Sequence, residues 1–159
     1  MTPIILIDSL IAFVEMAVVN FELQSNNPDI KKAPQVLGGY LDEKKPGPKQ
    51  DPPDFPYVII RYLEDDDQQD GNNAKVRIMA GTYSEDAKDG WRDAMNVITR
   101  IKQALLKQGI IGGCFRVEKP IKTELPEEQP YPEWVALMTI SVVMPQIYEE
   151  GGYQSDLEN

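Results

Sequence analysis

The side chains that could carry chemistry in this sequence are mainly carboxylates, and they gather in one acidic run. The run EDDDQQDGNN spans residues 64–73 and contains five of them: Glu64, Asp65, Asp66, Asp67 and Asp70. Carboxylate oxygens are ligands that calcium prefers. In an EF-hand alignment on Gly71, however, the last carboxylate that such a loop requires falls on Arg77. We therefore predict a solvated acidic loop between two strands, with no metal.

The other reactive side chains do not form a catalytic set. The chain has no histidine, which removes the commonest general base and the commonest metal ligand. Its single cysteine, Cys114, stands beside Phe115 and is expected to be a small buried apolar residue. No Gly-rich phosphate loop and no nucleophile elbow occurs. We predict neither an enzyme nor a bound cofactor. The alternative is a small hydrolase acting through two carboxylates that face each other across a cleft.

Composition predicts one acidic domain. The chain has 159 residues, 42% of them hydrophobic, which is enough for a single domain with a core. Its formal net charge of -10 at pH 7 argues against sequence-specific nucleic-acid binding and against an anionic membrane surface. The apolar segment 3–23 is interrupted by Asp8, Glu15 and Glu22, so it predicts neither a signal peptide nor a membrane span.

The sequence predicts two amphipathic helices, which should hold the reactive side chains in place. The clearer one covers residues 82–109, where apolar side chains recur at steps of three and four: Ala87, Trp91, Ala94, Ile98, Ile101 and Leu105. Ser84 is the expected N-cap, Thr82 and Glu85 fit a capping box, and Gly109 should end the helix.

The other helix is expected over residues 3–23. Its core-facing side chains repeat at helical spacing: Ile4, Ile7, Leu10, Ile11, Val14, Val18 and Phe21. Three further apolar residues lie off that face: Ile5, Phe13 and Val19. A second surface, such as that of a neighbouring subunit, is expected to pack against them.

Four segments rich in β-branched and aromatic residues predict strands: 57–63, 74–83, 114–117 and 133–144. Both faces of the last segment are partly apolar, so it should lie centrally in the sheet. The expected fold is α+β, with a mainly antiparallel or mixed sheet of about four strands and both helices packed on one face.

Residues 25–56 contain seven of the chain's 13 prolines and are expected to lack regular structure. This segment is either a solvated linker or an arm that becomes ordered against a partner. If it is an arm, Tyr40, Lys44, Lys45 and Lys49 are the residues we place at a subunit or tail interface. The acidic tail, residues 148–159, is expected to be loose.

Several strings in the chain resemble the tail terminator, or tail completion, proteins of long-tailed bacteriophages and prophages. The resemblance covers residues 56–147. Its most distinctive parts are GTYSED followed by GW, at residues 81–91, and PEEQPYPEW, at residues 126–134. It implies a single tail-terminator-like domain over residues 1–159 that forms a ring, expected to be a hexamer, on the head-proximal end of the tail tube.

The resemblance also implies what such a ring would do. It stops polymerisation of the tube and joins the tail to the filled head, so its partners are copies of itself, the tail tube protein and head-tail connector proteins. The chain would be a structural protein of the virion tail, assembled in the cytoplasm of the bacterial host. A head-tail connector, or neck, subunit of the same particle is the first alternative, and a non-viral adaptor domain is the second.

The acidic run suggests a mechanism for such a ring. Carboxylates that face a lumen repel DNA phosphates instead of binding them, and residues 64–70 are our candidates for that position. Ring closure needs a heterologous contact, in which one surface of a subunit meets a different surface of the next. We expect the loop at residues 44–54, an exposed strand edge and the spare apolar face of the first helix to supply it.

Overall fold

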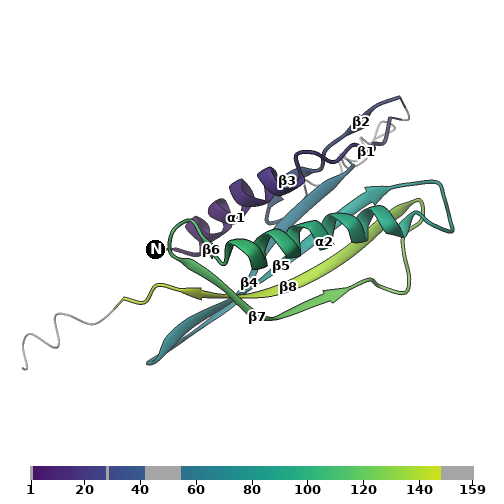
Figure 1. Ribbon diagram of the computed structural model, residues 1–159. Coiled ribbons are helices and arrows are strands. Elements are labelled where there is room, and N and C mark those ends of the chain that lie inside the picture. Colours follow the sequence, from purple (N-terminus) through teal and green to yellow (C-terminus); the bar gives the residue numbers. More distant parts are fainter. Residues whose placement is uncertain (1, 28, 42–54, 148–159) are drawn as a thin grey trace, which may run out of the picture.

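The structure is a computed structural model, and it describes residues 2–27, 29–41 and 55–147 (Figure 1). Its helices are α1 (Pro3–Val18) and α2 (Trp91–Gln108). A six-stranded sheet, in the order β3-β4-β5-β8-β7-β6, contains β3 (Gln35–Gly38), β4 (Tyr57–Gln68), β5 (Gly71–Tyr83), β6 (Ile110–Ile111), β7 (Phe115–Glu124) and β8 (Glu133–Met144). A two-stranded hairpin contains β1 (Leu23–Gln24) and β2 (Lys31–Lys32). No helix in the described part of the chain is long and apolar enough to cross a membrane.

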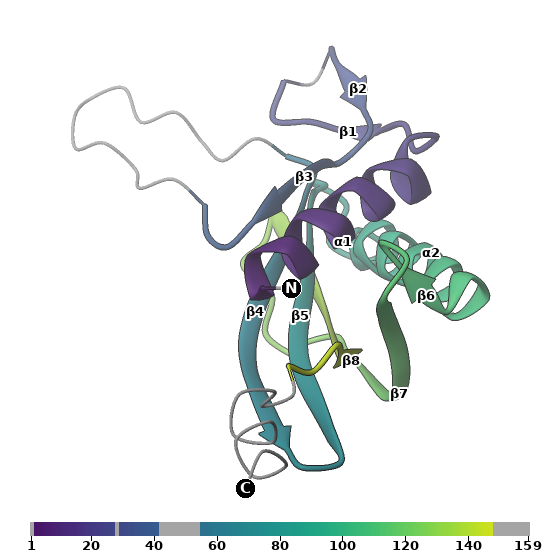
Figure 2. The same cartoon turned by 90° about the vertical axis from the view of Figure 1, so that its left-hand side faces the viewer.

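The sheet is mixed, because β3 runs parallel to β4 while every other neighbouring pair is antiparallel. It curls beneath the helices (Figure 2). The predicted α+β class is confirmed, and β8 lies inside the sheet between β5 and β7, as expected. The estimate of about four strands was wrong. The two additional strands, β3 and β6, lie at the sheet edges and are only four and two residues long, too short for a recognisable alternation.

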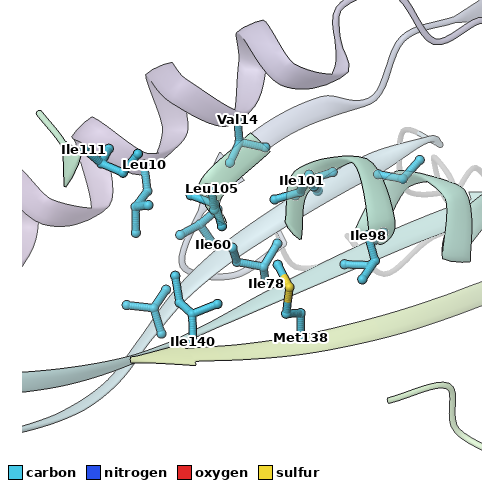
Figure 3. Close-up of a cluster of buried hydrophobic side chains, with 14 of the residues drawn as sticks. Leu10, Val14, Ile60, Ile78, Ile98, Ile101, Leu105, Ile111, Met138 and Ile140 are labelled. Atoms are coloured by element: carbon cyan, nitrogen blue, oxygen red, sulfur yellow. The ribbon is translucent and has the colours of Figure 1, made fainter. Parts of the chain in front are cut away.

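Both helices pack on the same face of the sheet, and the main core lies between them and that face (Figure 3). The helices contribute Leu6, Leu10, Val14 and Val18 from α1 and Ala94, Val97, Ile98, Ile101 and Leu105 from α2. The central strands contribute alternate side chains: Val76, Ile78, Ala80, Ala136, Met138, Ile140 and Val142. A second, smaller cluster on the opposite face is formed by Phe55, Tyr57 and Ile59.

The first helix is shorter than predicted and turns a slightly different face to the core. It begins after Thr2, whose hydroxyl accepts a hydrogen bond from the Ile5 N–H at 3.2 Å. It ends at Val18, because the chain turns there so that Leu23 can pair with Lys32 in the small hairpin. Ile4, expected in the core, is 71% exposed.

The predicted start of the second helix was wrong. Thr82 is the penultimate residue of β5, and the Ser84 hydroxyl accepts a hydrogen bond from the Asp86 N–H in the turn that follows. Helix α2 starts only after Gly90, and no side chain caps its N-terminus. Its end was predicted correctly, because Gly109 has a φ of 75° and its N–H donates to the Leu105 carbonyl.

The Pro-rich segment was wrongly expected to lack regular structure, since it contains β2 and β3. The pairing of β3 with the start of β4 supplies backbone hydrogen bonds that no local pattern reveals. Lys44, Lys45 and Lys49 lie outside the described residues, as does the tail at 148–159. The strand predicted at residues 114–117 is longer than expected, because β7 continues to Glu124.

Candidate functional site

The acidic run lies on a long β-hairpin, which corrects the prediction of a long loop. Strands β4 and β5 pair up to Gln68 opposite Gly71, so only residues 69–70 form the turn. Strand β8 in turn pairs with β5 as far as Asn72. These ladders supply the backbone hydrogen bonds that outweigh the low strand preference of aspartate. All five predicted carboxylates are exposed on this hairpin.

A bulge sets which face of the hairpin each carboxylate lies on. The register shifts between Tyr62 and Glu64, after which Glu64 lies opposite Lys75 and Asp65 lies opposite Ala74. Because cross-strand partners point to the same face, Asp65 shares the helix-covered face with the buried Ala74. Glu64 lies on the other face, and the residues that follow alternate between the two.

Most of the carboxylates on the hairpin have no cationic partner among the described residues. The one ion pair to these carboxylates among the described residues joins Glu64 to Lys75, at 4.0 Å and well exposed. Asp66 and Asp67 accept hydrogen bonds from side-chain amides, at 2.8 Å from Gln68 and 3.1 Å from Gln146. No group of three potential metal-ligating side chains occurs in the described part of the chain.

The Tyr62 hydroxyl donates a hydrogen bond to Asp65. Desolvation by burial, this hydrogen bond and the charge of Asp65 all raise the pKa of Tyr62. The hydrogen bond holds Asp65, the first acidic side chain on the helix-covered face, against the phenol.

The outer side of β4 is an unpaired strand edge over much of its length. Strand β3 covers only Tyr57–Ile60, and no described strand pairs with the outer side of β4 over residues 61–68 (Figure 2). We call this outer side the acidic edge. Unpaired backbone groups of this kind can accept another strand.

An apolar pocket opens where β3 ends and the acidic edge begins. Its volume is about 290 Å³, and its lining includes Ile4, Ile7, Tyr40, Ile60, Arg61 and Tyr62. The Arg61 Nε donates to the Gly39 carbonyl at 3.0 Å, and its guanidinium lies 4.1 Å from the centre of the Tyr40 ring. Tyr40 itself is 72% exposed. We call this the edge pocket.

The structure thus places one predicted interface residue, Tyr40, against Arg61, three residues before the first predicted acidic residue. Sequence reasoning missed the role of Arg61, although an arginine just before an acidic run inside a strand pattern could have drawn attention to it. Cys114 is half-buried just before β7 and does not take part in this site.

The hairpin of β1 and β2 was also missed. We call it the lysine hairpin, because its strand β2 consists of Lys31 and Lys32. The preceding residue, Ile30, is 49% exposed. The two lysines form no ion pair with any carboxylate in the described residues.

No family model matches the chain, and no curated protein matches it. Among 21 matching chains of solved structures, one known only by a sequence identifier shares 14% sequence identity. That match covers 74% of this chain and 83% of the other, with a TM-score of 0.40. A likeness at this level carries no argument about function.

Proposed function

We propose that this protein is a structural subunit of a phage virion that forms a ring on the tail tube, ends the growth of the tube and joins it to the head. The resemblance of residues 56–147 to tail terminator proteins supports this role. The structural observation that carries it is the projecting β4–β5 hairpin, whose carboxylates are exposed and mostly form no ion pair with any residue that the structure describes.

An acidic hairpin suits a ring through which DNA passes. DNA held by lysines and arginines would have to release those contacts to move, whereas carboxylates keep the phosphates away. At physiological ionic strength this repulsion extends over roughly 8 Å. Hairpins of several copies that each turn one acidic face toward a common axis would therefore line a channel that DNA crosses without binding. Such a role needs neither catalysis nor a cofactor.

Electron microscopy of particles made with and without the gene tests the proposal. We expect that deletion produces tubes of abnormal length that are not attached to heads, and that the wild-type gene supplied in trans restores attached tails of uniform length. Tails of normal length attached to filled heads in the deletion strain would refute the proposal. Tubes of normal length without heads would instead indicate a neck subunit.

A further inference from the structure

We propose that the acidic edge and edge pocket of one subunit receive the lysine hairpin of a second copy of this chain. Ile30 fills the edge pocket, while Lys31 and Lys32 meet the carboxylates at residues 64–67. This inference rests on the proposed ring and identifies the contact that would build it.

The acceptor side offers backbone hydrogen bonds, an apolar pocket and negative charge along one line. No described strand pairs with the edge from Arg61 onward, and the edge pocket opens at its beginning. The carboxylates follow immediately along the strand. An added strand would therefore gain main-chain hydrogen bonds along the edge, burial of one apolar side chain and several ion pairs.

The lysine hairpin offers the matching groups in the same order. Ile30 is exposed, and the two lysines follow it. The Ile30 carbonyl accepts a hydrogen bond from the Ser25 N–H at 3.2 Å, so Ile30 directs this group toward β1. Successive residues of an antiparallel strand direct their backbone groups to opposite sides, so the N–H and carbonyl of Lys31 point away from β1. Strand β2 has no described partner on that outer side.

The alternation of side chains also fits. In an extended strand Ile30 and Lys32 share one face, and Lys31 lies on the other. If β2 adds parallel to β4, in the direction that β3 already takes, Ile30 enters the pocket on the helix-covered face. Lys32 then approaches Asp65 on that face, and Lys31 approaches the carboxylates on the opposite face.

Other strand edges of the chain would be poorer partners for the acidic edge than the lysine hairpin. A second acidic edge would set carboxylates against carboxylates, which is destabilising for cross-strand pairs. The outer edge of β7 contains Pro120, which has no N–H to donate, and its ladder with β8 is interrupted between Glu118 and Lys122. Moreover, Arg116 and Lys122 already form ion pairs within the strand.

The positions of the two surfaces determine the kind of assembly. The lysine hairpin and the tip of the β4–β5 hairpin lie at opposite ends of the molecule in both views (Figures 1 and 2). When a subunit receives the hairpin of one neighbour and gives its own hairpin to another, the contact is heterologous, with one acceptor and one donor on each subunit. Such contacts produce a closed ring when the rotation between neighbours closes.

Sedimentation velocity on the full chain tests this contact through charge reversal. We expect the wild type to assemble. K31E/K32E should need at least about a tenfold higher concentration for the same assembled fraction, because the lysines no longer face opposite charges. D65K/D66K should show the same loss, and I30S a smaller one. The control K88E/K119E changes two other exposed lysines in the same way and should assemble like the wild type.

Mixing the two charge-reversed proteins distinguishes a lost contact from a lost fold. In an alternating ring every K31E/K32E hairpin would meet a D65K/D66K edge, and every wild-type hairpin would meet a wild-type edge. The equimolar mixture should therefore assemble although neither protein does so alone. Charge-reversed variants that assemble like the wild type, or a wild type that remains monomeric, would refute the contact. The tail-length experiment tests the proposed function separately, because it does not depend on which surfaces meet.

Discussion

Gly81 shows how closely single residues are fitted in this sheet. It lies opposite Tyr57 in the β4–β5 ladder, with the tyrosine ring across it. A Cβ at this position would lie 2.6 Å from the Tyr57 hydroxyl oxygen, and even closer to the ring. We predict that G81A lowers the free energy of unfolding by about 1–3 kcal/mol, because the ring must leave a packed site.

The control for this substitution lies on the same strand. A Cβ added at Gly71 meets nothing within 4 Å. G71A should therefore leave the free energy of unfolding unchanged or raise it by up to about 1 kcal/mol. Urea denaturation measures both variants, and equal values for the two would mean that the Tyr57 ring moves aside without cost.

Asp93 gives a prediction about pH. Burial in the first turn of α2 raises the pKa of this carboxyl above its ordinary value of 3.8. The folded chain therefore holds this proton more tightly than the unfolded chain. The proton on Asp93 stabilises the fold fully while the pH is below the pKa of this carboxyl in the unfolded chain. This stabilisation is lost as the pH rises through the pKa of the carboxyl in the folded chain.

The variant D93N isolates this effect from the chain's other acids. We compare the free energies of unfolding as a difference, D93N minus wild type. This difference should increase from about pH 3 until the pH exceeds the pKa of Asp93 in the folded chain, and then stay constant. Urea denaturation at a series of pH values measures this difference. A difference that decreases with pH would show that the positive end of the helix dipole stabilises the carboxylate more than burial destabilises it.

At the scale of elements, the segment between β5 and α2 is held by Trp134 of β8. The buried Trp134 indole N–H donates to the Ser84 carbonyl at 2.9 Å. A Cβ on Gly90 would lie 2.5 Å from the indole nitrogen, so glycine allows the tryptophan to pack against the start of the helix. Tyr131 packs edge-on against the same indole and donates to the Glu85 carbonyl at 2.7 Å.

We predict that W134F lowers the free energy of unfolding by at least about 1–3 kcal/mol, because the Ser84 carbonyl loses its buried donor. The control is W91F, which changes the chain's other tryptophan, a half-buried residue at the start of α2. Circular dichroism during denaturation suits both variants, because fluorescence would change with either substitution. A loss as large for W91F as for W134F would contradict this role for the indole.

At the scale of the whole molecule, the proposed contact between copies implies a second effect of the acidic edge. Like charges on an exposed strand keep it from pairing with itself. We predict that D65N/D66N/D67N keeps the fold but forms irregular, concentration-dependent aggregates, because its edges no longer repel one another. Light scattering at low salt measures this. D86N/D89N, which neutralises two carboxylates in the turn before α2, should remain free of aggregates.

The helices and central strands could be predicted because their patterns are local. In α2 and β8 the buried side chains recur at helical and strand spacing, so the core faces of both followed from the order of residues. The start of α2 could not be predicted, because Ser84 is held by Trp134, fifty positions away, and not by the helix. Strand β3 likewise depends on pairing with a segment that follows a long connection.

The sequence alone determined the α+β class, the two helices and the alternation along β5 and β8. These follow from periodicity and composition, which each stretch of chain carries in itself. Only the tertiary structure decided that the acidic run is a strand with an unpaired edge, that Tyr40 stacks on Arg61 beside it, and that Ile30 and two lysines lie at the other end of the molecule. Strand pairing joins distant segments, and the surfaces it leaves open depend on which strand lies at the edge.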